Sequence, residues 1–310
     1  MKPGTLLARL AVLAAIVGLL PLGARLWWGF DLLSHFRVQY LACALPLLVA
    51  VLAYRRRLAA LLLAVTAGIN AWPLLPYLPA SSATAASPAT SELKVLNINV
   101  NASNRNFAAI LDAIRTADAD IVAVLELTPG LDDALNTLST KYPYSYTLPA
   151  TSNFGIGVLS RYPLTAQTLP LLATKAIDGL VDLPTGTLRF IAVHLVPPIH
   201  GDFAQMRNRQ LGELATLARA SGEPLVVCGD FNLTPYSPFF GGFREQSGLT
   251  EARRGKGIAM SWPSFMPLLG VPIDHCFIGE PVSARSVERL ERTGSDHYPV
   301  LVTLTWPGNQ

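Results

Sequence analysis

The sequence predicts an all-α transmembrane region followed by one domain of mixed α and β structure. Three apolar runs occupy residues 6–22, 38–54 and 58–78, and each approaches the roughly 20 residues that a helix needs to cross the hydrocarbon core of a bilayer. Residues 80–92 are small and polar without periodicity, which is typical of a flexible linker. From residue 93 to residue 310 short apolar runs alternate with turns and helical patterns, which favours an α+β or layered α/β domain.

The three apolar runs are interpreted as retained membrane spans, so that residues 1–79 form a transmembrane region. None of the runs shows the alternation of a strand or the wide polar stripe of a surface helix. The alternative for the first run is a cleavable signal peptide. No small-residue cleavage site follows that run before Leu26 and Trp27, and two more apolar runs come afterwards.

Basic residues predict how the spans are oriented. Lys2 and Arg9 flank the start of the first span, and residues 55–57 are three consecutive arginines between the second and the third. The positive-inside rule places both groups on the cytoplasmic side. With three spans, everything after residue 80 is then expected outside the cytoplasm. The sequence therefore predicts a multi-pass protein of the inner (plasma) membrane, with the lipid bilayer as its partner and no obligate protein partner evident.

In the C-terminal domain, residues 93–310, seven strands and two helices are predicted. The expected strands are residues 93–99, 121–126, 156–160, 187–194, 224–228, 274–278 and 298–305. Apolar residues at helical spacing predict one helix near residues 107–114 and another near residues 203–217. No internal sequence repeat is evident.

Charge and cysteine content narrow the class of protein. Residues 1–92 hold seven basic and two acidic residues, a net charge of +5, whereas residues 93–310 hold 17 basic and 19 acidic residues, a net charge of −2. A dedicated DNA-binding domain usually has a basic excess, because neutralising phosphates drives its affinity. Three cysteines cannot form a disulfide framework. Cys228 and Cys276 are interpreted as small core residues, with a bridge between neighbouring strands as the alternative.

Polar side chains follow several of the expected buried strands. Asn97, Glu126 and Asp230 each come at the end of an apolar run, and Asp296 and His297 directly precede one. Carboxylate and amide oxygens gathered at strand ends indicate a site for a hard cation such as Mg²⁺, with an imidazole beside it. The pattern therefore predicts a metal-dependent phosphoester hydrolase.

An ordered set of motifs resembles the endonuclease/exonuclease/phosphatase superfamily, which has the deoxyribonuclease-I-like fold. The motifs are Leu-Asn97-Ile, Asp-Ile-Val-Ala-Val-Leu-Glu126, Gly155-Ile-Gly-Val-Leu-Ser-Arg161, Val193-His194-Leu, Gly-Asp230-Phe-Asn232, Ile273-Asp274-His275 and Ser-Asp296-His297-Tyr-Pro-Val. With its apolar N-terminal region, the chain is similar to the bacterial membrane-anchored members. The resemblance implies a four-layered α/β/β/α sandwich, with a site at one sheet edge.

Within this site, Asn97, Glu126 and Asp296 are the expected metal ligands. Oxygen ligands alone suit Mg²⁺ or Mn²⁺ better than zinc, which prefers His and Cys. The metal would polarise a phosphoryl oxygen and neutralise charge in the transition state.

The remaining site residues are expected to handle protons and phosphate. His297 is the expected acid–base or phosphate-contacting imidazole, and the resemblance pairs it with Asp274. Asp230 could position or deprotonate the attacking water, so the general base is either Asp230 or His297. Asn232 and His194 are expected to donate hydrogen bonds to nonbridging oxygens.

Several neighbouring residues are kept out of the expected site. Strand alternation points His275 away from Asp274. Asn99 shares a face with Asn97 but is not assigned as a ligand, and His35 is expected at the surface. Arg207 and Gln210, one helical turn apart, fit either a substrate rim or a solvated helix face.

The sequence thus predicts a membrane-anchored phosphodiesterase, nuclease-like enzyme or phosphatase that uses in-line attack of water on phosphorus. Nucleic acid, a nucleotide or a phospholipid head group remains open as the substrate. The alternative is a membrane-tethered binding or sensing module built on the same fold.

Overall fold

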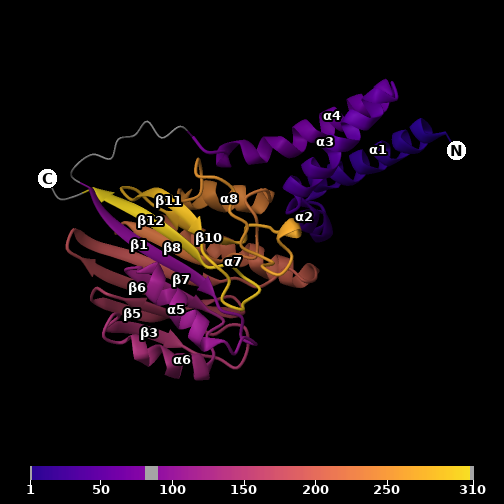
Figure 1. Ribbon diagram of the computed structural model, residues 1–310. Helices are drawn as coiled ribbons and strands as arrows, with labels where there is room; N and C mark the ends of the chain where they lie inside the picture. The colour runs from indigo at the N-terminus through magenta and orange to yellow at the C-terminus, as the bar shows by residue number, and fades with distance from the viewer. Residues whose placement is uncertain (1, 81–89, 308–310) are drawn as a thin grey trace.

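The computed structural model describes residues 2–80 and 90–307, and its C-terminal part contains two six-stranded β-sheets packed face to face (Figure 1). The first sheet has the order β11 (Ser283–Arg289), β12 (Val300–Pro307), β1 (Thr90–Asn99), β2 (Ile121–Leu125), β4 (Ile156–Ser160) and β3 (Tyr144–Leu148). The second has the order β5 (Leu164–Leu171), β6 (Thr174–Leu183), β7 (Gly186–His194), β8 (Leu225–Asp230), β10 (Asp274–Ile278) and β9 (Thr250–Glu251).

Helices cover the outer face of each sheet. Helices α5 (Phe107–Ala117) and α6 (Pro129–Leu135), followed by the 3₁₀ turn η3 (Asn136–Leu138), share one apolar cluster with the first sheet. Helices α7 (Gly201–Arg219) and α8 (Pro238–Ser247) share another with the second sheet. A third cluster lies between the sheets. The result is the expected four-layered α/β/β/α sandwich.

The central strands are apolar along their whole length because both of their faces are covered. In β2, Ile121, Ala123 and Leu125 face the second sheet, whereas Val122 and Val124 face the helices. All five side chains are buried. Alternation along a strand sends successive residues to opposite faces, so a continuous apolar run is what a strand between two layers requires.

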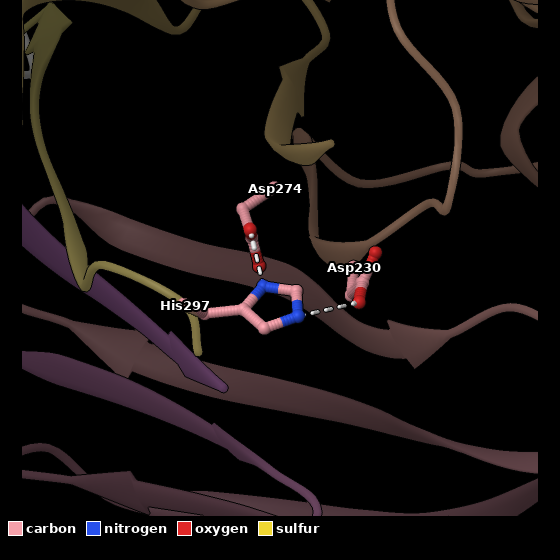
Figure 2. A group of neighbouring side chains, drawn as sticks. All are labelled: Asp230, Asp274 and His297. Carbon is pink, nitrogen blue, oxygen red and sulfur yellow. Dashed lines mark hydrogen bonds and ion pairs between the residues drawn. The ribbon is translucent and has the colours of Figure 1, made fainter. Parts of the chain in front are cut away.

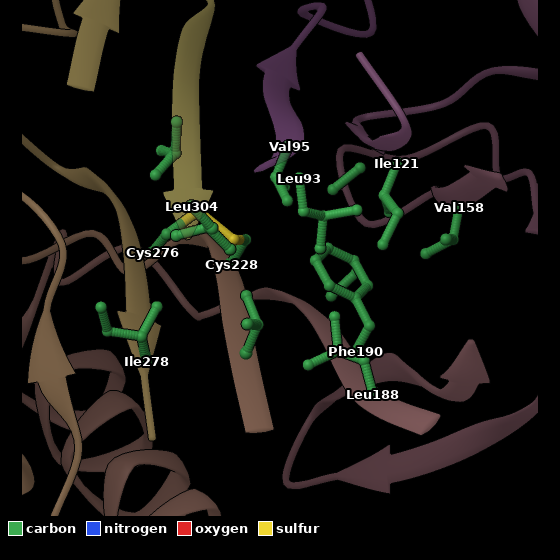
Figure 3. Packing of buried hydrophobic residues seen from close by; sticks show 14 of the residues in the cluster. Leu93, Val95, Ile121, Val158, Leu188, Phe190, Cys228, Cys276, Ile278 and Leu304 are labelled. Atoms are coloured by element: carbon green, nitrogen blue, oxygen red, sulfur yellow. A yellow bond between two sulfur atoms is a disulfide. The ribbon is translucent and has the colours of Figure 1, made fainter. Parts of the chain in front are cut away.

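A disulfide bond lies in the core between the sheets (Figure 3). Cys228 of β8 stands directly opposite Cys276 of β10 in the antiparallel register, and the two residues are bridged. The structure therefore replaces the interpretation of two free core thiols with the alternative of a bridge between neighbouring strands.

Both sheets follow the same plan. A parallel pair, β1–β2 or β7–β8, forms the centre of each sheet, and every other pairing is antiparallel. One helix joins the two parallel strands in each case, α5 in the first sheet and α7 in the second. The carboxyl ends of parallel strands meet at one edge of a sheet, and this edge carries the polar strand ends.

The N-terminal region is helical and extends away from the sandwich (Figure 1). Helix α1 (Pro3–Leu19) with η1 (Leu20–Gly23), and α4 (Arg57–Ala71) with η2 (Trp72–Tyr77), form two stretches long and apolar enough to cross a membrane. Helices α2 (Trp28–Ser34) and α3 (Arg37–Ala53) meet at a 66° bend and would make a third if they are one span. Most of the predicted linker, residues 81–89, lies outside the described residues, and β1 begins at Thr90.

Packing within the helical region buries mainly small residues, together with Val51 and Leu63, and leaves many large apolar residues outside. Ala11, Ala44, Ala59 and Ala60 are buried where α1, α3 and α4 meet. Leu13, Ile16, Val49, Leu61 and Val65 are exposed on the outside. Small residues at helix contacts are characteristic of packing in lipid, where large apolar side chains gain nothing by turning inward.

Helix α2 and the bend that follows it, residues 28–36, attach the helical region to the second sheet's helices. Arg207 Nη2 of α7 donates to Asp31 Oδ2 at 2.7 Å, and Ser237 Oγ donates to the other oxygen of Asp31 at 2.6 Å. All three side chains are buried. His35 Nδ1 lies 2.9 Å from Thr234 Oγ1. His35 is therefore buried at this contact and is not a surface residue as the sequence suggested.

Candidate active site

Polar side chains from both sheets converge at one edge of the sandwich. In the second sheet, His194, Asp230 and Asp274 stand side by side across β7, β8 and β10. From the first sheet come Asn97 and Asn99 of β1, Glu126 directly after β2, and His297 shortly before β12. All seven side chains are buried. The expected site residues from these strands are thus brought together.

His297 is fixed by a hydrogen bond to Asp274 (Figure 2). Its Nδ1 lies 2.8 Å from Asp274 Oδ2, and its backbone N–H donates to Ser295 Oγ. Asp274 is anchored in turn, because its backbone N–H donates to Ser261 Oγ. The other ring nitrogen, Nε2, therefore faces Asp230.

Asp230 Oδ2 is the point on which the surrounding groups converge. His194 Nε2 lies 3.6 Å away and His297 Nε2 3.7 Å away, both beyond normal hydrogen-bond length. Asn99 Nδ2 lies 3.3 Å from the same oxygen. Two imidazoles, a carboxylate and an amide thus surround one small volume without closing it.

Burial and neighbouring charges move the pKa values of the two imidazoles in opposite directions. Burial opposes a charge on His297, but the Asp274 carboxylate outweighs it and raises the pKa of His297 to about 10. Burial, together with His297, lowers the pKa of His194 to about 4. At neutral pH the site therefore pairs a cationic imidazole with a neutral one.

The two facing carboxylates also differ. Burial, followed by repulsion from Asp274, raises the pKa of Asp230 to about 8. Burial acts in the same direction on Asp274, but the charge and hydrogen bond of His297 outweigh it and lower the pKa of Asp274. Carboxylates whose environments push their pKa values apart are typical of acid–base sites.

Unusual backbone conformations direct two of the site residues. Glu126 has φ of 60° and Asn232 has φ of 49°, in the left-handed region that side chains other than glycine seldom adopt. Gly229, before Asp230, has φ of 159°, and a Cβ there would lie 1.9 Å from Val193 O. Glycine is therefore required where β8 approaches the end of β7.

Asn232 is held by three contacts around its loop. Its backbone N–H donates to Asp230 Oδ1 at 2.8 Å, and its side-chain Nδ2 donates to Leu195 O at 2.9 Å. Arg207 Nη1 donates to the carbonyl of Asn232 at 3.2 Å. One Nδ2 proton is engaged by Leu195, which leaves the second as the donor available to a ligand.

The expected metal ligands have oxygen atoms that could bind a cation. Asn97 Oδ1 is buried and has no hydrogen-bond partner among the described residues. Burying an unpartnered polar atom costs free energy, and a bound cation would remove that cost. Burial raises the pKa of Glu126, whose oxygens accept from Asn99 Nδ2 and the backbone of Ala102. Asp296 accepts from Asn101 and from Trp262 Nε1. Each carboxylate keeps further lone pairs for a ligand.

The acidic groups near His297 offer a second possible cation position. One ligand atom each from Asp230, Asp274 and His297 lies within 4.8 Å of the others. Because Asp274 already accepts from His297 Nδ1, the oxygen-rich side near Glu126 and Asn97 is the better match for a hard cation.

Asn99 is the site residue that the sequence assignment left out. Its amide contacts Glu126 Oε1 at 3.2 Å, Asp230 Oδ2 at 3.3 Å and His297 Nε2 at 3.4 Å. The available signal was its spacing, since residues two apart on a strand share a face. His275 lies on the opposite face of β10, near Glu251 and the carbonyl of Leu233, as alternation predicts.

Arg207 and Gln210 belong neither to a substrate rim nor to a solvated helix face. Both are fully buried. Gln210 accepts from the backbone of Val196 and donates to Leu172 O, so it fixes the loop after His194. Arg207 joins Asp31 to the Asn232 loop.

A cavity of about 430 Å³ opens above the site. Glu126, His194, Asp230, Asp296 and His297 contribute to its polar part. Much of the remaining lining is apolar, and Leu32 and Phe36 of the helical region form part of its wall.

The fold is thus a two-sheet sandwich that gathers imidazole, carboxylate and amide groups at one edge. The sequence model of the endonuclease/exonuclease/phosphatase family matches residues 96–297, and the chain belongs to this family. Its members are phosphoester hydrolases. No curated protein is significantly similar to the chain in sequence.

Solved structures support the same fold. An endonuclease/exonuclease/phosphatase from Beutenbergia cavernae has a TM-score of 0.59 and 19% identity, with 70% of this chain and 72% of that chain covered. D. rerio TDP2 complexed with a single-strand DNA product has a TM-score of 0.57 and 16% identity, with coverages of 69% and 99%. A Staphylococcus aureus beta toxin with bound magnesium ions has a TM-score of 0.57 and 15% identity, with coverages of 68% and 99%.

Proposed function

We propose that this protein is a membrane-anchored, Mg²⁺- or Mn²⁺-dependent phosphoester hydrolase that uses in-line attack of water on phosphorus. The observation that carries the proposal is the convergence of His194, His297 and Asn99 on Asp230 Oδ2, with His297 fixed by Asp274. The gap between these groups suits a phosphoryl group, whose oxygens need donors on several sides.

Each residue has a distinct role in this reaction. His297, kept cationic by Asp274, donates from Nε2 to a nonbridging oxygen and offsets charge that builds on the phosphoryl group. Asp230 in its ionised form accepts the proton of the attacking water, since the cationic His297 has no free lone pair. Because burial raises the pKa of Asp230 to about 8, this ionised form increases as the pH rises through about 8. Neutral His194 and the second amide proton of Asn232 supply further hydrogen bonds.

Asn97, Glu126 and Asp296 would hold the divalent cation, with Asn99 beside Glu126. The cation would supply Lewis-acid polarisation of a phosphoryl oxygen. The magnesium ions of the similarly folded beta toxin support this choice of metal. The unpartnered oxygen of Asn97 supports the choice of ligands.

Membrane anchoring and an extracytoplasmic catalytic domain complete the proposal. Support comes from the arginines at residues 55–57 between two spanning candidates and from the Cys228–Cys276 bridge. Disulfides persist in oxidising compartments and are rare in the cytosol. Three spans with a cytoplasmic start would give the same placement.

The activity is tested with the full chain in detergent or nanodiscs, using bis-p-nitrophenyl phosphate and p-nitrophenyl phosphate. We expect turnover with Mg²⁺ or Mn²⁺ and none with excess chelator. His297→Ala should lower kcat/KM by about 10³-fold, whereas His200→Ala, an exposed histidine, should change it less than about twofold. A folded protein that binds Mn²⁺ but hydrolyses neither ester would favour the binding module.

The orientation is tested by reporter fusions after Gln310 and by thiol counting. Alkaline phosphatase, active only outside the cytoplasm, should be active in the fusion, and green fluorescent protein should stay dark. Denatured protein should take up one alkylating group without reductant and three with it, since the chain has three cysteines. An active cytoplasmic reporter would reverse the assigned orientation.

A further inference from the structure

The cavity above the active site is built jointly by the catalytic domain and the helical region. Leu32 of α2 and Phe36 of the bend before α3 line the same cavity as Glu126, Asp230 and His297. A wall from residues next to the predicted membrane spans is not needed for attack on phosphorus. The wall instead contacts the part of the substrate that lies beside the phosphate.

This wall is a fixed part of the fold. The buried ion pair of Asp31 and Arg207, at 2.7 Å, holds α2 against α7. At the start of α3, Gln39 Nε2 donates to Gly270 O at 2.7 Å. The helical region is therefore fastened to the loops on two sides of the cavity, and Leu32 and Phe36 stay beside the catalytic groups.

The chemistry of the cavity changes from its floor to its sides. Phe154, Pro197, Trp262, Val271 and Ile273 continue the apolar lining that Leu32 and Phe36 begin. Among the described residues that line the cavity, none is Lys or Arg. A nucleic acid needs cationic contacts along its backbone, so this lining favours a substrate with one phosphate group beside apolar carbon.

Large apolar side chains are exposed around the same opening. Ile199 lines the cavity and is 67% exposed. In the loop before Val271, Phe265, Met266 and Leu269 are exposed, and Leu268 is 89% exposed. Gln39 contacts the carbonyl of Leu268, so this loop lies at the first turn of α3. Apolar residues gathered at the start of the span predicted at residues 38–54 fit the membrane interface.

We propose that the cavity takes a membrane lipid phosphoester. The phosphate lies between Asp230, His194 and His297, and the acyl or alkyl chain lies along Leu32 and Phe36 toward the bilayer. Hydrolysis adds water across one P–O bond: the hydroxyl goes to phosphorus, and the proton goes to the departing alcohol oxygen by way of Asp230. This inference rests on the proposed phosphoester hydrolysis and specifies its substrate.

The test uses the full chain in nanodiscs and p-nitrophenyl alkyl phosphodiesters with methyl, butyl and octyl groups, below their micelle concentrations. Each buried methylene is worth about fourfold in binding. With only part of the chain buried, kcat/KM for the octyl ester should exceed that for the methyl ester by about thirtyfold or more. Both kcat/KM values are measured on the same preparation. A partial loss of folded protein lowers both equally and does not change the octyl-to-methyl ratio.

Variants then locate the chain-binding wall. Phe36→Ala and Leu32→Ala should each lower the octyl-to-methyl ratio about fivefold or more, through KM, and Phe36→Leu should restore most of it. Leu52→Ala is the matched control, because Leu52 is exposed on α3 and does not line the cavity. A ratio that these two alanine variants leave unchanged would overturn the assigned wall.

The outcomes separate this inference from the proposed function. Equal turnover of the methyl and octyl esters would overturn the lipid site and leave the hydrolase intact. Faster cleavage of a ten-nucleotide thymidine oligomer than of the octyl ester would also overturn it. Failure to hydrolyse any of these esters with either cation would overturn the proposed function itself.

Discussion

The helical region and the sandwich domain differ in where they place large apolar side chains. In the sandwich, large residues such as Phe190, Phe231 and Phe277 are fully buried. In the helical region, the buried cluster consists mainly of alanines with Val51 and Leu63, while Leu13 and Val65 are more than half exposed. The difference is the one expected if the helical region lies in a membrane, as proposed, and the sandwich lies in water. Water drives apolar surface inward, whereas lipid leaves close packing and hydrogen bonds to hold helices together.

The contact between the two regions should give the largest effect on stability. Arg207→Met leaves Asp31 buried without its cation, which should cost about 3–5 kcal/mol. Arg209→Met, two positions along α7 and exposed, should cost less than about 0.5 kcal/mol. Thermal unfolding of the full chain in detergent measures both. Adding Asp31→Leu to Arg207→Met should recover part of the loss, and no recovery would contradict the pairing.

A charge on the outer face of each region should then show which solvent that face meets. Val65→Asp places a carboxylate on the outside of α4 and should cost about 2.5–3.5 kcal/mol if that face lies in lipid. Leu180→Asp, also partly exposed but on β6, should be close to neutral. The fraction of each variant recovered folded from carbonate-washed membranes reports the difference. Equal recovery would mean that α4 does not face lipid.

Glycine substitutions test close packing with a smaller expected effect. A Cβ on Gly18 would lie 2.7 Å from Thr66 Cγ2, whereas a Cβ on Gly68 would have nothing within 4 Å. Gly18→Ala should therefore destabilise the helices by about 1–2 kcal/mol. Gly68→Ala should be neutral or slightly stabilising. A melting temperature that falls equally in both variants would count against the contact of α1 with α4.

Burial explains which strands could be predicted. The seven predicted strands became β1, β2, β4, β7, β8, β10 and β12, all interior to their sheets. The strands that were missed include all four sheet edges, β3, β5, β9 and β11. The remaining missed strand, β6, carries Asp178 at its centre, where that residue pairs with Arg189 of β7. Edge strands are partly solvated, so their residues lack the apolar run that marks a buried strand.

The site was predictable where strand ends brought it together and not where a distant segment contributed. His194, Asp230 and Asp274 could be assigned from their strand ends and motifs. The burial of Arg207 depends on Asp31, 176 positions away, and His35 is buried by Thr234, 199 positions away. No local pattern encodes a contact between an N-terminal helix and the catalytic domain. For the same reason, only the structure could assign Leu32 and Phe36 to the cavity.

The order of the strands along the chain sets the order in which the site can be completed during synthesis. The second sheet draws its strands from one continuous stretch, β5 to β10, whereas the first sheet takes β1 to β4 from the start of the domain and β11 and β12 from its far end. Until residues 283–307 have been made, β1 lacks its antiparallel neighbour β12. His297 lies in the connection between β11 and β12. The imidazole and its neighbour Asp296 are therefore the last groups of the candidate site to be made, and the site stays incomplete until the first sheet has closed.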